Sequence, residues 1–77
     1  MSLTYKEKRE IETTLLSIIR ANPSGINTRV LISNAHAKVI SSIPHANRHH
    51  IAGMIAWIVK LGSAHFRIRT LGHSVIV

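Results

Sequence analysis

Residues 15–31 have the sequence LLSIIRANPSGINTRVL, and this stretch decides how the first half of the chain folds. Its apolar start continues a spacing that begins at Ile11 and is typical of one face of an amphipathic helix. The segment Asn-Pro-Ser-Gly that follows concentrates turn formers, and Pro23 disfavours helical geometry at the residue before it. The sequence therefore predicts a first helix that ends near Ala21, followed by a reversal of the chain.

Candidate capping residues mark the starts of the first two helices. Thr4 and Glu7 have the spacing of a capping box, in which each side chain accepts a hydrogen bond from the other's backbone, so we expect the first helix to begin there. After the turn, Asn27 or Thr28 is suited to cap a second helix, which should end near Ile40. The residues expected on its buried face are Leu31, Ile32, Ala35 and Val39.

A third helix is expected after a short break. Ser42 is a candidate cap, Pro44 suits a first helical turn because its missing donor is not needed there, and Gly62 can end the helix in a left-handed conformation. The apolar face predicted for this helix consists of Ile51, Met54, Ile55, Ile58 and Leu61, with Trp57 beside it. We expect Trp57 and Tyr5 to be packing residues.

After Gly62 the hydrophobic period changes from that of a helix to two, which predicts strands. In residues 65–69 Phe66 and Ile68 alternate with cationic side chains, so we expect these two to face inward. Residues 70–73 contain a glycine and predict a turn, and residues 74–77 are mainly β-branched. Together they predict a β-hairpin at the C-terminal end of the sequence.

Size and composition limit the function classes. The 77 residues suit one domain, 1–77, and the 45% hydrophobic content is enough for a core. The absence of cysteine excludes disulfides, thiolate metal sites and cysteine nucleophiles. The uncharged apolar run 51–59 is too short to span a membrane, and residues 1–7 lack the features of a signal peptide, so we expect a cytoplasmic protein with no membrane partner.

Charge is distributed unevenly along the chain. The three acidic residues all lie before Thr13, where three lysines and arginines balance them. The net charge of +7 therefore arises entirely from residues 13–77, which contain no carboxylate side chain. A small domain with charge of one sign attracts polyanions, and nucleic acid is the commonest soluble polyanion.

The order of three helices and a cationic hairpin resembles the winged helix-turn-helix superfamily, in the form found in small prokaryotic, archaeal or viral regulators. The run 15–31 is similar to the first-helix, turn and second-helix region of that family. In the third helix, Ile51, Ile55, Ile58 and Gly62 match its core positions and terminating glycine. The resemblance covers residues 11–77 and departs from the family at Ser63, where an aliphatic residue is usual. It implies an α+β fold and a double-stranded DNA-binding protein, a transcriptional regulator that is nucleoid-associated in a prokaryotic or virus-infected cell.

The resemblance also implies roles for individual residues. The third helix would enter the major groove, and the hairpin, or wing, would lie along the backbone. The positions expected to face bases are Asn47, Arg48, His49, Ala52 and Gly53. The side chains expected near phosphate are Lys60, Arg67, Arg69, Arg29 and Lys38, and His73 is expected to add a pH-dependent contact. Asn47 has the alternative role of bonding to local backbone groups.

We expect neither a cofactor nor catalysis. His45 and His49 are four residues apart, as metal ligands on one helical face would be, and His50 is adjacent. A zinc site nevertheless needs further ligands, and neither a cysteine nor a nearby carboxylate supplies them. The sequence contains no recognisable catalytic set and no phosphate-binding glycine loop, and no small-molecule ligand is evident.

Three other functions stay open at the level of sequence. They are RNA or ribosome binding, membrane activity of a cationic peptide, and protein interaction through Ala52, Gly53 and Ala56 and through the apolar end 75–77. The small number of aromatic residues disfavours a platform for single-stranded nucleic acid. The family also implies a two-fold homodimer, and edge pairing through the last strand is one route to it.

Overall fold

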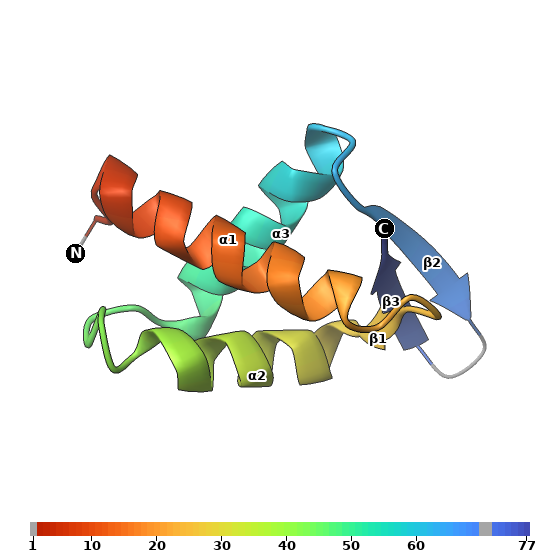
Figure 1. The fold of residues 1–77 in the computed structure, drawn as a ribbon, viewed down its shortest axis with the longest axis horizontal. Coiled ribbons are helices and arrows are strands. Elements are labelled where there is room, and N and C mark those ends of the chain that lie inside the picture. The colour runs from red at the N-terminus through yellow and green to blue at the C-terminus, as the bar shows by residue number, and fades with distance from the viewer. Residues whose placement is uncertain (1, 70–71) are drawn as a thin grey trace.

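The computed structural model describes residues 2–69 and 72–77, and at 68 and 69 the backbone alone. The elements occur in the order α1 (Tyr5–Arg20), β1 (Ile26–Asn27), α2 (Thr28–Val39), α3 (Arg48–Lys60), β2 (His65–Arg69) and β3 (Gly72–Ile76). Figure 1 shows the helices packed together, with the strands at one end of the molecule. The described part of the chain is thus an α+β fold in which three helices precede a C-terminal β-hairpin, as the sequence predicts.

α1 begins at the predicted capping box. The Thr4 hydroxyl accepts a hydrogen bond from the Glu7 backbone N–H at 3.1 Å, and the Glu7 carboxylate accepts one from the Thr4 N–H at 2.8 Å. These bonds satisfy two of the donors that a helix N-terminus leaves without partners. The helix ends at Arg20 with Ala21 as its C-cap, so both predicted ends are confirmed.

The reversal after α1 is also confirmed. Asn22 closes the end of the helix by donating its side-chain N–H to the carbonyl of Ile18 at 2.8 Å. Gly25 has a φ of +101°, a backbone conformation that side chains disfavour, and donates its N–H to the Asn22 carbonyl at 2.8 Å. Of the two candidate caps for α2, Asn27 is the N-cap, because its side-chain oxygen accepts from the N–H of Arg29.

α3 begins later than the sequence predicts. Ser42 does not cap it and Pro44 lies before it: the N-cap is Asn47 and the first helical residue is Arg48. Ile43 and Ala46, in the connection, are 2% and 5% exposed. Burying these two side chains holds the connection against the core, so residues 40–47 form a loop rather than a longer third helix.

The sheet contains a strand that the sequence analysis did not foresee. Its order is β1-β3-β2, and both pairings are antiparallel. Ile26, a lone apolar residue between the turn and the cap of α2, forms β1 with Asn27 and pairs with Val75 of β3. The last strand in the sequence, β3, is therefore the middle strand of the sheet. Both of its edges are paired, so it is not available for the edge pairing considered as one route to a dimer.

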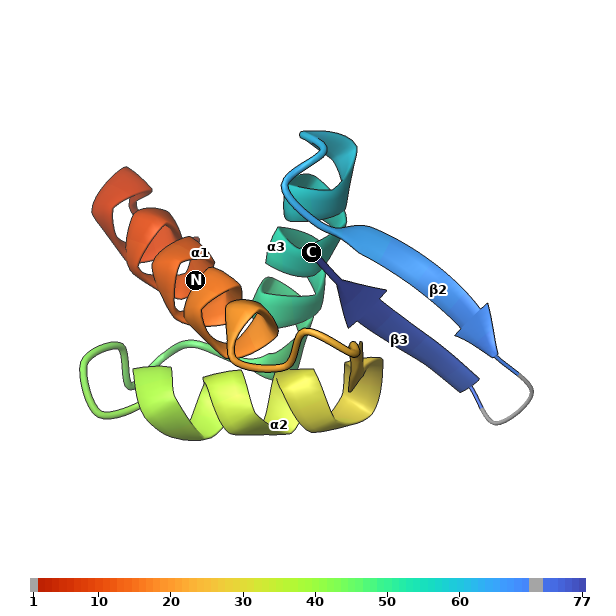
Figure 2. The same ribbon diagram turned by 45° about the vertical axis from the view of Figure 1, so that its right-hand side comes forward.

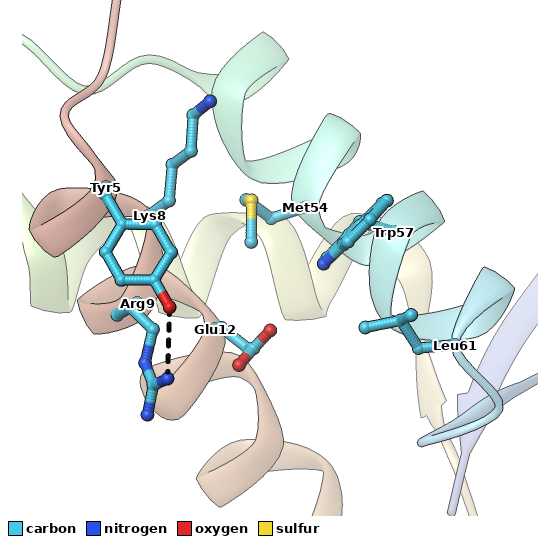
Figure 3. Close-up of a pocket in the computed structure, with 7 residues that line it drawn as sticks. All are labelled: Tyr5, Lys8, Arg9, Glu12, Met54, Trp57 and Leu61. Carbon is cyan, nitrogen blue, oxygen red and sulfur yellow. Dashed lines mark hydrogen bonds between the residues drawn. The ribbon is translucent and has the colours of Figure 1, made fainter.

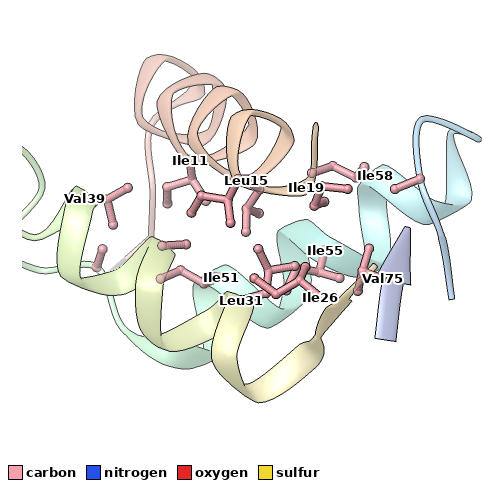
Figure 4. Packing of buried hydrophobic residues seen from close by; sticks show 14 of the residues in the cluster. Ile11, Leu15, Ile19, Ile26, Leu31, Val39, Ile51, Ile55, Ile58 and Val75 are labelled. Carbon is pink, nitrogen blue, oxygen red and sulfur yellow. The ribbon is translucent and has the colours of Figure 1, made fainter. Parts of the chain in front are cut away.

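The core lies where the three helices and the sheet meet (Figure 4). Ile11, Leu15 and Ile19 of α1 are completely buried, and so are Leu31 of α2 and Val75 of β3. α3 contributes Ile51, Ile55 and Ile58, each no more than 2% exposed. Ala64, between α3 and β2, is also fully buried and was not predicted as core.

Four expectations about packing are wrong. Leu61 is 57% exposed, Trp57 48% and Tyr5 76%. Their exposure follows from geometry: the N-terminal half of α1 and the C-terminal half of α3 diverge (Figure 2), so side chains there have no neighbouring helix to cover them. Phe66 is 48% exposed because β2 is an edge strand, although its partner Val75 is buried.

Candidate functional site

The outward face of α3 is the first component of the site. Because Ile51, Ile55 and Ile58 turn toward the core, the helical period places a different set of side chains in solvent. The exposed residues on that face are His49, Ala52, Gly53, Ala56 and Lys60. Apart from His49 and Lys60 these side chains are small, so in the middle of this face the surface lies close to the helix backbone. Basic side chains lie near both ends.

Gly53 has no packing role within the described chain. A Cβ built at this position would meet no atom within 4 Å, and the backbone angle is not in the left-handed region. A glycine inside a helix costs about 0.5–1 kcal/mol relative to alanine. Nothing among residues 2–69 and 72–77 explains this cost, which makes the surface over Gly53 a candidate for close approach by another molecule.

A hollow of about 440 Å³ lies between α2 and α3. It is lined by Arg29 and Ile32 of α2 and by Arg48, His49 and Ala52 of α3. Arg29 and Arg48 occupy the first turns of their helices, and neither first turn contains an acidic residue. Helix N-termini favour negative charge, so these two arginines together with the adjacent backbone N–H groups form an anion-attracting surface.

The hairpin joins this surface through the start of α2. A second hollow of about 480 Å³ is lined by Asn27, Thr28, Arg29, Gly72 and His73. The Thr28 hydroxyl donates to the His73 carbonyl at 3.1 Å, which ties the beginning of β3 to α2. Since Arg29 lines both hollows, the surface is continuous from His73 across α2 to α3.

Lys8 extends the surface on the other side of α3, and the sequence analysis missed it. A third hollow, of about 560 Å³, is lined by Lys8, His49, His50, Gly53 and Met54 together with Ser2 and Leu3. Residues 1–12 have no net charge, so the charge distribution alone does not predict a place for Lys8 on this surface. The spacing could have indicated it, because Lys8 lies three residues before the buried Ile11 and so lies on the same side of α1. We call the residues Lys8, His49, Arg48, Arg29 and His73 the basic band.

Asn47 is a structural cap. Its side-chain oxygen accepts from the His50 N–H at 2.9 Å, and its own N–H donates to His50 Nδ1 at 3.2 Å. A bidentate contact with adenine, the base contact that an asparagine side chain suits, would need that same oxygen and so would compete with the cap. Of the two roles considered for Asn47, the structure shows the local one.

The remaining predicted contacts are dispersed. Lys38 lies in a different hollow, with Ser17 and Asn22 of the α1 side, and is not brought together with Arg29. Arg67 is exposed on β2 opposite Ser74, and Lys60 is exposed in the last turn of α3. The side chain of Arg69 lies outside the described residues.

The histidine arrangement considered for a metal is wrong. His45 precedes α3 and therefore does not share a helical face with His49. Its Nε2 instead lies 3.2 Å from a carboxylate oxygen of Glu7, without hydrogen-bond geometry. Among residues 2–69 and 72–77, no group of three or more histidines and acids is placed to hold a metal ion.

The Glu7 carboxylate links α1 to the connection before α3. The Thr4 backbone N–H, the strongest influence, lowers the pKa of Glu7 below its ordinary value of 4.5. Partial burial opposes this effect, whereas the Thr4 hydroxyl and the neighbouring His45 lower the pKa further. Glu7 is therefore ionised at neutral pH, and the negative charge lies at the helix end that favours it.

None of the helices described is long and apolar enough to cross a membrane. No protein-family model, no curated protein and no solved structure matches this chain.

Proposed function

We propose that this chain is a winged helix-turn-helix domain that binds double-stranded DNA, with α3 in the major groove and the β2–β3 hairpin along the backbone. The observation that carries the proposal is the basic band, which joins the starts of two helices to the hairpin and includes no acidic side chain. We further propose a regulatory rather than enzymatic role, acting on DNA in the cytoplasm of a prokaryotic or virus-infected cell.

The outward face of α3 supports insertion into a groove. The major groove is about 12 Å wide and admits one helix. The middle of the outward face carries only small residues, which are Ala52, Gly53 and Ala56. The backbone of α3 could therefore approach base edges closely. Arg48, at the start of α3 and exposed, is the side chain best suited to a bidentate contact with guanine or to a phosphate.

The start of α2 and the hairpin support contacts with the backbone. Arg29 suits one phosphate, since its guanidinium attracts the phosphate oxygens and the α2 dipole favours negative charge at this helix end. The Thr28–His73 bond would keep the hairpin at a defined distance from that phosphate. Arg67 and Lys60 would reach further phosphates along the duplex.

The direct test is the affinity for a labelled mixed-sequence duplex, measured by fluorescence anisotropy over a series of salt concentrations. If about five phosphates are neutralised, the logarithm of affinity should fall with the logarithm of salt with a slope of about −4 to −5. Duplex RNA of the same sequence is the competitor. The absence of DNA binding at low salt, or tighter binding of RNA, contradicts the proposal.

Two substitutions that each remove one positive charge locate the interface. Arg48→Ala removes a member of the basic band and should weaken DNA binding by about ten-fold or more. Lys38→Ala is the matched control, because Lys38 lies in the hollow on the α1 side, and it should change the affinity by no more than about two-fold. Equal losses in both variants would show that net charge, not this surface, determines binding.

A further inference from the structure

A hollow between α1 and α3 shares only Lys8 with the basic band. It measures about 610 Å³ and lies where the N-terminal half of α1 and the C-terminal half of α3 diverge (Figure 3). Tyr5, Lys8, Arg9 and Glu12 of α1 line one side, and Met54, Trp57 and Leu61 from α3 and its C-cap line the other. We call this hollow the α1–α3 groove.

The α3 side of the groove is an apolar stripe that no other element of the described chain covers. Met54, Trp57 and Leu61 follow one another at intervals of three and four residues, which places them along one side of the helix. Trp57 and Leu61 are exposed, and Met54 is only partly buried. Apolar residues at this spacing are those through which one helix packs against another, so the stripe suits a further helix.

The exposure of the groove favours a protein partner over a small ligand. Sites for small molecules bury about 70–90% of the ligand surface. Tyr5, Trp57 and Leu61, by contrast, keep much of their own surface in solvent, and a partner with bulk of its own would cover them more completely. Gathered apolar side chains rimmed by charges are typical of protein-interaction surfaces.

The charged side chains of the groove determine the sign of the partner. Lys8 and Arg9 line it against a single carboxylate, that of Glu12, which leaves the lining with a net charge of +1. The Tyr5 hydroxyl accepts a hydrogen bond from the Arg9 guanidinium at 3.5 Å, which keeps this cation at the rim (Figure 3). The net charge of +7 on the whole chain adds a field of the same sign. Both effects favour a partner whose apolar residues are flanked by carboxylates.

We infer that the α1–α3 groove binds an acidic amphipathic helix of a partner protein. The apolar face of that helix would pack on Met54, Trp57 and Leu61, as helices fill grooves through residues three and four positions apart. Carboxylates along one edge of the helix would face Lys8 and Arg9. The inference does not rest on the proposed DNA binding, because the other members of the basic band lie outside the groove.

Titration of the full chain with a synthetic peptide, followed by the fluorescence of Trp57, tests the inference. The probe is a peptide of about 18 residues without tryptophan, with leucines at helical spacing on one face and glutamates beside them. It should bind with a Kd below roughly 100 µM and shift the Trp57 emission to shorter wavelength, because the indole leaves water.

Two control peptides separate the contributions of the apolar face and the charge. One has the same composition with its leucines scrambled, and the other has lysines in place of the glutamates. Each should bind at least about ten-fold more weakly than the acidic amphipathic peptide. Absence of binding by the acidic peptide, or equal binding by either control, overturns the inference. So does an emission shift with phosphatidylglycerol vesicles but none with the acidic peptide, which would mean a lipid surface instead.

Two matched substitutions test the location of the surface. Leu61 and Ile40 are both exposed aliphatic C-caps, of α3 and α2 respectively, but only Leu61 lines the groove. Leu61→Asn should weaken binding of the acidic peptide by about ten-fold or more, and Ile40→Asn by no more than about two-fold. Equal affinities of the two variants for the peptide overturn the assignment. Both variants keep the basic band, so their DNA affinity should match that of the wild type, and failure of this inference is distinguishable from failure of the proposed function.

Discussion

At the scale of single residues, the structure distinguishes a side chain that caps a helix from its neighbour on the proposed DNA-binding surface. Asn47 and Arg48 are neighbours and both are exposed, yet Asn47 completes a capping box with His50 whereas Arg48 lines the hollow beside Arg29. Position in the sequence could not separate them, because the difference depends on where α3 begins.

Replacing Asn47 tests its role as a cap. Asn47→Ala should lower the free energy of unfolding by about 1 kcal/mol, the usual cost of losing an N-cap side chain. Urea denaturation measures this loss. Asn34→Ala is the control: Asn34 is exposed in α2, where alanine is the better helix former, so its stability should be equal or slightly higher. Unchanged stability in Asn47→Ala would show that the cap contributes nothing.

The charge of Glu7 should make stability depend on pH. Its pKa in the folded state is lowered, chiefly by the Thr4 backbone N–H, so its contribution is present above the ordinary value of 4.5 and is lost as pH falls through the lowered folded value. Glu7→Gln keeps a capping side chain but removes the charge. The variant should therefore show a smaller loss of stability than the wild type between pH 5 and pH 3, measured by thermal unfolding. Parallel pH profiles would contradict this assignment.

At the scale of secondary structure, α3 has three sides with different surroundings. One side is buried against α1 and α2, one is the outward face with small side chains in its middle, and the third lines a hollow between α1 and α3 with Met54, Trp57 and Leu61. The amphipathic spacing predicts the buried side. The two exposed sides of α3 differ because of the directions in which α1 and α2 cross α3.

Gly53→Ala tests helix stability and DNA affinity separately. The added methyl group has open space and removes a helix-disfavouring glycine, so the variant should be about 0.5–1 kcal/mol more stable. If α3 lies close to base edges, the same methyl group should weaken DNA binding. Urea denaturation and anisotropy measure the two effects. Increased stability with unchanged DNA affinity would show that α3 does not approach DNA closely at this position.

At the scale of the whole molecule, the net charge of +7 is carried outside residues 1–12, where positive and negative side chains balance. The basic band should therefore lose affinity for DNA as salt rises, because counterions compete for phosphate. Fluorescence anisotropy at low and high salt measures this loss. An affinity that does not change with salt would contradict a role for these charges in DNA binding.

The sequence by itself determined that there are three helices, the cap at Thr4, the turn at Gly25 and the final hairpin, and it narrowed the second cap to Asn27 or Thr28, because hydrogen bonds and backbone preferences that span a few residues specify these features. The tertiary structure alone decided the start of α3, the pairing of Ile26 with Val75, the place of Lys8 in the basic band and the exposure of Trp57. Each of these depends on contacts between residues distant in the sequence. Local periodicity shows that a side chain is apolar or charged, but only the packing of the helices determines which of those side chains share a surface.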